Sequence, residues 1–222
     1  MSSGRAILFD FNGVIIDDEP QHCEALIATL AEYGIALDRA GYYRDYLGFD
    51  DRECFRFSFA RAGRPTDGPA IAEAIERKAG HYERSVRHTM TLVPGAADFV
   101  RAAGDEGHQL GIVSGALRRE IELVLTVAGL HAHFGVIVAA EDVPACKPDP
   151  AGYRRGREAL GVAADRCLVI EDSRPGLAAA RAAGMRCAML STSHPADALA
   201  DADAVWPDFS GRSPAQLPWA NA

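Results

Sequence analysis

Residues 5–13 read RAILFDFNG, an apolar run that ends in an acid and is broken at once by Asn12-Gly13. A short apolar run followed by Asn-Gly is typical of a buried strand that enters a tight loop. An acid at the end of so apolar a segment is costly to bury unless it has a use. We therefore expect Arg5–Phe11 to form a buried strand and Asp10 to be a functional residue.

Short apolar runs alternate with helical segments from residue 91 onward. We expect strands at residues 108–114, 134–139, 166–171 and 185–190, with helices at residues 96–103, 117–128, 150–160 and 175–183. Such alternation implies right-handed βαβ crossovers and a parallel sheet covered by helices on both faces. The sequence therefore predicts an α/β fold with a doubly wound, Rossmann-like parallel sheet.

The segment between the first strand and residue 91 carries only helical patterns, at residues 21–33, 51–62 and 69–87. It contains no convincing strand, so we expect an all-helical cap domain inserted into the α/β core. The predicted domains are a core of residues 1–17 and 91–222 and a helical cap of residues 18–90. The tail, residues 210–222, is expected to be a loop.

The composition is that of a globular protein, since 48% of the 222 residues are hydrophobic and 24% are charged. A net charge of −8 without a basic run argues against nucleic acid as a partner. The sequence has no signal-peptide pattern, no apolar run near the ~18 residues of a membrane span, and five widely spaced cysteines. We expect a cytoplasmic protein with reduced thiols and no membrane partner. We take it to be a monomer, although the sequence does not decide the oligomeric state.

Polar residues gather directly after the first four predicted strands. In a doubly wound sheet, ligands bind beyond the carboxyl ends of the strands, so these residues are expected to meet at one edge. They are Asp10, Asn12 and Gly13 after the first strand, Ser114, Gly115 and Ala116 after the second, Lys147 after the third, and Glu171 and Asp172 after the fourth. Carboxylates, a hydroxyl, backbone amides and a lysine would thus converge.

The acidic members of this set suit phosphoryl transfer from a monoester. Asp10 is ionised at neutral pH, because a free aspartic acid has a pKa of ~3.9, and it would attack phosphorus to form an aspartyl phosphate. Mg²⁺ prefers hard oxygen ligands, which Asp10, Asp172 and the backbone carbonyl of Asn12 supply. Glu171 would be a further metal ligand or would lie behind the ligands.

The remaining members would bind the phosphate group. Lys147 offers a compact positive charge for one oxygen, and the Ser114 hydroxyl with the amides at Gly115 and Ala116 would donate to another. All of these residues, the acids included, also have an ordinary structural interpretation. Ser114-Gly115 could form a turn and Asp172–Pro175 the start of a helix. Lys147 could be a solvated loop residue, and Glu171 could make a hydrogen bond to a loop. Their joint position at strand ends favours function.

Four short motifs carry a family resemblance. Asp10-Phe11-Asn12-Gly13-Val14, Ile112-Val113-Ser114-Gly115, Lys147-Pro148 and Ile170-Glu171-Asp172-Ser173 resemble, in order, motifs one to four of the haloacid dehalogenase superfamily. Residues 13–22, GVIIDDEPQH, and the helical insertion look most like its β-phosphoglucomutase and phosphoglycolate phosphatase subgroup. The resemblance covers essentially the whole chain. It implies a Mg²⁺-dependent phosphohydrolase or phosphotransferase with a phospho-Asp10 intermediate and a small phosphorylated metabolite as substrate.

The chain departs from this subgroup at Asn12, where the family places an aspartate as general acid and base. A carboxamide neither delivers nor accepts a proton here. General acid and base catalysis contributes typically ~10²–10⁴-fold, so esters with poor leaving groups should react slowly, and acyl phosphates, aryl phosphates and pyrophosphate should suffer less. His22 is the best substitute because it titrates near neutrality, with an ordinary helix residue as the alternative. Asp17 and Asp18 are interpreted as helix-start acids.

The predicted cap contains one loop of interest, residues 47–53, LGFDDRE, which resembles the substrate-facing cap loop of the subgroup. The resemblance implies a lid that closes to exclude water and to select the substrate. Arg52 would hold a distal anionic group of the substrate, and Arg44 is a second candidate. A solvated helix residue is the alternative for both.

A phosphatase is the leading interpretation. A sugar phosphomutase needs the same site and stays open. A haloacid dehalogenase proper is disfavoured, because its chemistry needs no Mg²⁺ acids and this chain has both Glu171 and Asp172. Asn12 keeps open a third interpretation, a catalytically weakened protein that binds a phosphorylated metabolite and responds through cap closure.

Overall fold

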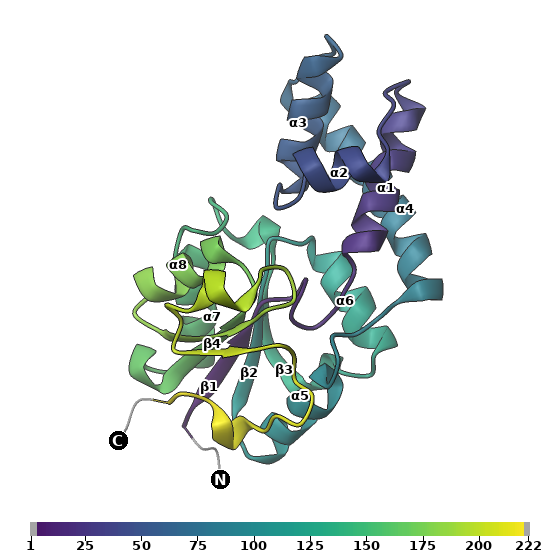
Figure 1. The fold of residues 1–222 in the computed structure, drawn as a ribbon. Helices are drawn as coiled ribbons and strands as arrows, with labels where there is room; N and C mark the ends of the chain where they lie inside the picture. The colour runs from purple at the N-terminus through teal and green to yellow at the C-terminus, as the bar shows by residue number, and fades with distance from the viewer. Residues whose placement is uncertain (1–3, 220–222) are drawn as a thin grey trace. The chain divides into compact units, whose positions relative to one another are not determined.

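The computed structural model describes residues 4–219, which separate into two compact units. The core unit joins the N-terminal segment up to Asp17 with the chain from Thr91 onward, and the helical insert runs from Asp18 to Met90. Figure 1 shows the sheet within the core unit and the helices of the insert.

The core unit is built on a six-stranded parallel sheet in the order β3-β2-β1-β4-β5-β6. The strands are β1 (Ala6–Phe9), β2 (Gln109–Val113), β3 (Phe134–Val138), β4 (Cys167–Glu171), β5 (Arg186–Leu190) and β6 (Ala204–Trp206). Strands β2 and β3 extend the sheet to one side of β1, and β4 to β6 extend it to the other. The strand order therefore reverses between β1 and β4, which is where doubly wound sheets bind ligands. The predicted α/β class with a helical insertion is confirmed.

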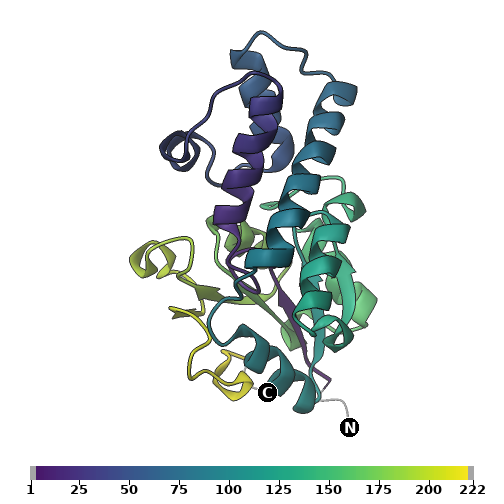
Figure 2. The same ribbon diagram turned by 90° about the vertical axis from the view of Figure 1, so that its right-hand side faces the viewer.

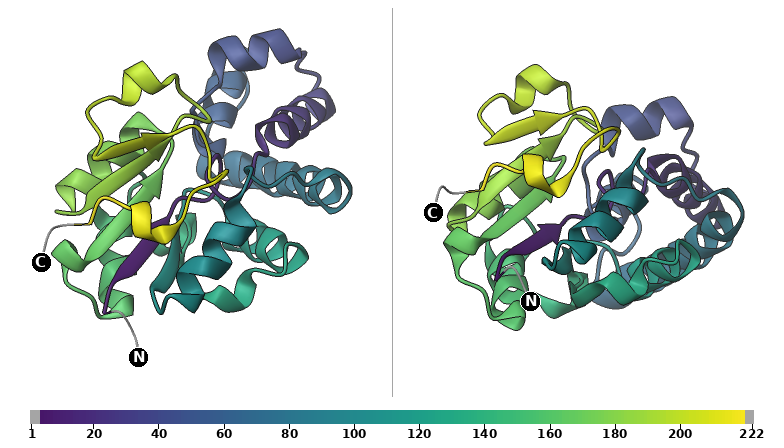
Figure 3. Two further views of the ribbon diagram at one scale, coloured as in Figure 1. Left: turned by 60° about the horizontal axis from the view of Figure 1, so that its bottom comes forward. Right: turned by 90° about the horizontal axis from the view of Figure 1, so that it is seen from below.

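Helices cover both faces of this sheet. Helices α5 (Ala96–Asp105) and α6 (Arg118–Val127) lie on one face, and α7 (Ala151–Leu160) and α8 (Arg174–Ala182) lie on the other (Figure 3). All residues of β1 and β4 are buried, as expected for inner parallel strands with apolar neighbours on both sides. The short 3₁₀ turns of this unit are His131–His133, Ala140–Asp142, Ala164–Arg166, Ala196–Leu199 and Pro214–Gln216.

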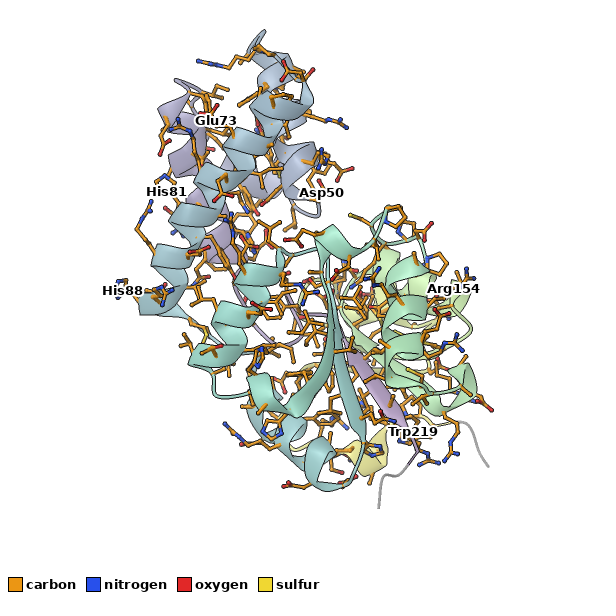
Figure 4. All side chains as sticks on the ribbon, turned by 180° about the vertical axis from the view of Figure 1, so that it is seen from behind. Asp50, Glu73, His81, His88, Arg154 and Trp219 are labelled. Carbon is orange, nitrogen blue, oxygen red and sulfur yellow. The ribbon has the colours of Figure 1, made fainter. Side chains whose placement is uncertain are left out.

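The helical insert has four helices and its own apolar core. They are α1 (Glu19–Glu32), α2 (Arg39–Asp45), α3 (Asp51–Arg61) and α4 (Gly68–Thr89). Helices α1 and α4 run side by side (Figure 2), and the buried residues Leu26, Phe55 and Phe59 belong to the apolar cluster of the insert. Aspartates cap α2, α3 and α4, with Asp50 at the start of α3 (Figure 4). Among residues 4–219, no helix is both long and apolar enough to cross a membrane.

Three local predictions differ from the structure. Helix α2 was not predicted, because it has only seven residues and includes a glycine and two tyrosines, which weakens a helical pattern. Strand β6 has three residues, too few for a periodic signal. The tail, expected to be a loop, contains the turn at Pro214–Gln216 and the buried Leu217, while residues 220–222 of that prediction lie outside the described residues.

Candidate active site

Three carboxylates meet where the strand order reverses. Asp10 follows β1, and its backbone N–H donates to the Ile170 carbonyl at 2.9 Å, which continues the pairing of β1 with β4. Glu171 ends β4 and Asp172 follows it. One oxygen from each of the three acids lies within 4.8 Å of the others. The adjacent strands thus bring these acids together although their positions in the sequence are far apart.

The loop after β1 comes close to Asp172, and this requires a glycine at residue 13. Gly13 has a φ of +70°, and a Cβ at this position would lie 2.0 Å from Oδ2 of Asp172. Two hydroxyls from the segment after β5 hold the same region. The Thr192 hydroxyl donates to the Gly13 carbonyl at 2.6 Å, and the Ser193 hydroxyl donates to Oδ2 of Asp172. A single segment therefore fixes both the first loop and one acid.

Lys147 joins two of the acids. Its Nζ lies 2.7 Å from Oδ1 of Asp10 and 2.6 Å from Oε1 of Glu171. Glu171 is fully buried, and its Oε1 also accepts a hydrogen bond from the Tyr153 hydroxyl at 2.9 Å. The other oxygen, Oε2, accepts from the backbone N–H groups of Asp172 and Ser173 and from the Ser173 hydroxyl, each at 2.9 Å. Both oxygens of Glu171 are therefore already held by protein donors.

Burial shifts the pKa values in this cluster most, and the neighbouring charges come second. Burial and then the Glu171 charge raise the pKa of Asp10 from 3.8 to about 7, against the attraction of Lys147. Burial, Glu171 and Asp10 raise the pKa of Asp172 well above its usual range. Burial also works to raise the pKa of Glu171, but the Lys147 ammonium and the donors to its carboxylate hold that pKa below its ordinary value. Burial works to lower the pKa of Lys147, yet Asp10 and Glu171 keep it above its ordinary value.

The donor set fits a hard divalent cation. Three buried carboxylates face a single ammonium, so two of the negative charges have no compensating positive side chain in the cluster. Oxygen ligands of this kind are those that Mg²⁺ and Ca²⁺ prefer. Because both oxygens of Glu171 already accept hydrogen bonds, Asp10 and Asp172 are the better placed ligands.

The residues after β2 lie at the same edge of the sheet, since β2 pairs with β1. Ser114 is buried, its N–H donates to the Val138 carbonyl at 2.9 Å, and its hydroxyl oxygen accepts from the Ala116 N–H at 3.0 Å. Gly115 is exposed between them. Asn12 lies half-buried in the loop after β1 and forms a bridge with Ile16.

His22 lies on α1 and is held within the helical insert. Its Nε2 lies 3.3 Å from the Asp18 carboxylate, its Nδ1 lies 2.8 Å from Nζ of Lys78, and its ring stacks on Tyr82 at 4.4 Å between centroids. Because a lysine ammonium only donates, Nδ1 accepts and Nε2 carries the proton. Asp18, interpreted above as a helix-start acid, makes no capping bond; it is buried and accepts from the Tyr82 hydroxyl.

The two arginine candidates lie on helices of the insert. Arg52 is exposed in the first turn of α3. Arg44 is paired with the neighbouring Asp45 through Nε and Nη2, at 3.0 and 2.9 Å. An arginine committed to an adjacent carboxylate is less available for a substrate anion, so Arg52 is the better candidate of the two.

Comparison with known proteins places the chain in a family. A family model for haloacid dehalogenase-like hydrolases matches residues 7–190, which include Asp10, Lys147, Glu171 and Asp172. The chain belongs to the haloacid dehalogenase-like hydrolases.

Individual relatives of this hydrolase agree with that assignment. It is 33% identical over 189 residues to hexitol phosphatase B of Escherichia coli strain K12, with 84% of each chain covered. Its structure matches a variant of CbbY from Rhodobacter sphaeroides in complex with xylulose-1,5-bisphosphate, with a TM-score of 0.85, 27% identity and 95% and 97% of the two chains covered. A β-phosphoglucomutase of Clostridium difficile shares the fold, with a TM-score of 0.80, 21% identity and coverage of 95% and 93%. The predicted superfamily and subgroup are confirmed.

Sequence reasoning missed three residues at the site of this haloacid dehalogenase-like hydrolase, namely Tyr153, Thr192 and Ser193. The rule that found the acids, inspection of the residues after each strand, also finds Thr192 and Ser193 when it is applied to β5. Tyr153 gave no signal, because it lies inside a helix and reads as a core residue.

Proposed function

We propose that this haloacid dehalogenase-like hydrolase is a Mg²⁺-dependent phosphatase of small phosphorylated polyhydroxy metabolites, with Asp10 as nucleophile. The observation that carries the proposal is the buried cluster of Asp10, Glu171 and Asp172 with Lys147 as the one ammonium bonded to two of them. Two relatives support the substrate class, since one is named a hexitol phosphatase and the other was crystallised with a sugar bisphosphate.

The roles follow from the position of each group. An oxygen of Asp10 attacks phosphorus, the bond to the alcohol breaks, and an aspartyl phosphate forms, which water then hydrolyses. Asp10, Asp172 and the backbone carbonyl of Asn12 would hold Mg²⁺, which supplies charge neutralisation that lets an anion approach a phosphate dianion. In this assignment Glu171 acts mainly by holding Lys147.

Lys147 and the β2 loop would bind the phosphate oxygens. Two of the three N–H donors of Lys147 are matched by Asp10 and Glu171, and the third is assigned to the phosphate. The Ser114 hydroxyl and the backbone amides at Gly115 and Ala116 are assigned to a second oxygen. These donors follow β2 and β3, which lie on the same side of β1.

Asn12 sets the leaving-group preference in this proposal. Its side chain has no proton to give to a departing alkoxide, so turnover of alkyl phosphates is expected to be slow unless another group protonates the alcohol. His22 would act in that way only after giving up its bonds to Lys78 or Asp18. Acyl and aryl phosphates need no such proton.

We further propose that residues 1–17 and 91–222 form the catalytic domain and that residues 18–90 form a lid. Closure of such a lid would exclude water and bring Arg52 to a distal anionic group of the substrate. The exposure of Arg52 on α3 supports this assignment.

The experiment is a phosphoester panel with Mg²⁺, containing hexitol phosphates, xylulose-1,5-bisphosphate, acetyl phosphate and p-nitrophenyl phosphate. It is run on wild type, Asp10→Ala and Asn12→Asp. Turnover by wild type that is lost in Asp10→Ala supports the phosphatase. An inert wild type with an active Asn12→Asp variant would instead favour a protein that binds the metabolite, which the carboxamide at residue 12 specifically allows.

A further inference from the structure

Helix α7 is seated unusually close to the sheet. A Cβ on Gly152 would lie 2.9 Å from Cγ1 of Val113, and one on Gly156 would lie 3.0 Å from Cγ2 of the same residue. Both distances are shorter than ordinary van der Waals contacts, so the two glycines, one turn apart, let the helix backbone approach β2. The buried side chain between them is Tyr153, while its neighbour Arg154 lies on the outside of the core unit (Figure 4).

Tyr153 reaches two members of the charged cluster from this position. It is fully buried, and its hydroxyl donates to Oε1 of Glu171 at 2.9 Å. The Nζ of Lys147 lies 5.1 Å from the centroid of its ring, within the range of a cation–π contact. One rigid side chain therefore contacts both partners of the Lys147–Glu171 ion pair.

Helix α8 also makes room for the Glu171 carboxylate, because it has a glycine at the point of contact. A Cβ on Gly176, in the first turn of α8, would lie 1.8 Å from Oε1 of Glu171. The carboxylate thus occupies a slot between α8 and Tyr153. Its Oε2 is fixed by the start of the loop that follows β4, whereas Oε1, the oxygen that meets Lys147, is steadied by Tyr153.

We propose that Tyr153 is a positioning residue for Lys147 in the proposed phosphoryl transfer, on which this inference rests. A lysine side chain is a flexible stem with a point charge and is costly to order. The Tyr153 ring limits where the ammonium lies, and the Tyr153 hydroxyl fixes the carboxylate that the ammonium binds. Lys147 is thereby kept at Oδ1 of Asp10, with one donor directed to the phosphate.

The test is Tyr153→Phe, which keeps the ring and removes only the hydroxyl. We expect kcat to fall about tenfold with KM changed less than about threefold, because the bound phosphate keeps its other donors. Tyr153→Leu, which also removes the ring, should lose more. The matched control is Tyr42→Phe, since Tyr42 is a buried tyrosine of the insert that donates to Glu19 at 2.6 Å. It should lower the urea midpoint by a similar amount and leave kcat unchanged.

A double-mutant cycle shows whether Tyr153 acts through Lys147. In a Lys147→Ala background, or Lys147→Gln if the alanine variant does not fold, Tyr153→Phe should change kcat and the calorimetric Kd for inorganic phosphate less than about twofold. Equal losses in both backgrounds, or a Tyr153→Phe variant that behaves like Tyr42→Phe, would overturn the proposal.

The same cycle measured by urea unfolding separates this inference from the proposed function. Non-additive shifts of the midpoint are expected whether or not the protein is a phosphatase, because the contacts of Tyr153 with Lys147 and Glu171 exist in the protein itself. A wild type without phosphatase activity would therefore defeat the proposed function alone, and additive shifts would defeat the role of Tyr153.

Discussion

Replacement of Asp10 by asparagine should make the metal-free protein more stable. Asp10 has its pKa raised from 3.8 to about 7, by burial first and then by Glu171. At about 1.36 kcal/mol per pKa unit, the ionised Asp10 carboxylate lowers the free energy of unfolding by at most about 4 kcal/mol. Asp10→Asn removes the charge and keeps an oxygen that can accept from Lys147, so we expect a gain of about 2 kcal/mol or more at pH 8.

The pH dependence gives the sign of this effect. Well below pH 3.8 the carboxyl is protonated in both the folded and the unfolded chain, and it contributes nothing to the pH dependence. As the pH rises to about 7, the unfolded chain releases the proton while the folded chain retains it, so the folded state becomes less stable relative to the unfolded state. Above about pH 7 this destabilisation is constant. The gain from Asp10→Asn should therefore shrink to about 1 kcal/mol or less at pH 4.5.

The assay is urea unfolding in EDTA, followed by tryptophan fluorescence. Both tryptophans, Trp206 and Trp219, belong to the core unit, so the signal reports the unit that contains Asp10. Asp17→Asn, at an exposed acid of the same unit, is the control and should change little. A less stable Asp10→Asn at pH 8, or a gain independent of pH, would refute the reasoning.

Three further predictions test the site. Wild-type kcat should rise steeply as the pKa of the leaving alcohol falls. Asn12→Asp should flatten that dependence by raising kcat on alkyl phosphates ~10²-fold or more. Parallel plots of log kcat against leaving-group pKa for the two proteins would count against Asn12 as the cause. Ser193→Ala removes the hydroxyl that orients Asp172, and it should weaken Mg²⁺ binding about tenfold by calorimetry, whereas Ser210→Ala should not; equal affinities would exclude this role of Ser193. Mg²⁺ should raise the melting temperature of wild type and do so much less for Asp10→Asn, since ligand binding to the folded state alone stabilises it; equal increases would place the ion elsewhere.

The sequence predicts the parts of the site that obey a general rule. Asp10 and Asp172 directly follow buried strands, Glu171 ends one of them, and Lys147 comes in the segment after β3. Parallel topology brings such positions to one edge. That rule needs only strand identity, which hydrophobic runs reveal. It therefore placed the acids and the lysine in one cluster without knowledge of any distance.

The rest depends on packing that a single sequence does not encode locally. Tyr153 reaches Glu171 only because Gly152 and Gly156 bring α7 close to Val113. The engagement of His22 by both Lys78 and Asp18 depends on how α1 and α4 pair. Such contacts join residues that are far apart along the chain, and they leave no periodic pattern in the sequence.

The pairing of β1 with β4 has a consequence for biosynthesis. Ala6 pairs with Cys167, so Asp10 leaves the ribosome long before the strand that completes its surroundings. The helical insert has its own apolar cluster, and all its residues are synthesised well before β4. It can therefore fold before the partners of Asp10 have been made. Distant pairings of this kind fold slowly, and a nascent chain that stops short of β4 would carry a folded helical insert but not the cluster of Asp10, Glu171 and Asp172.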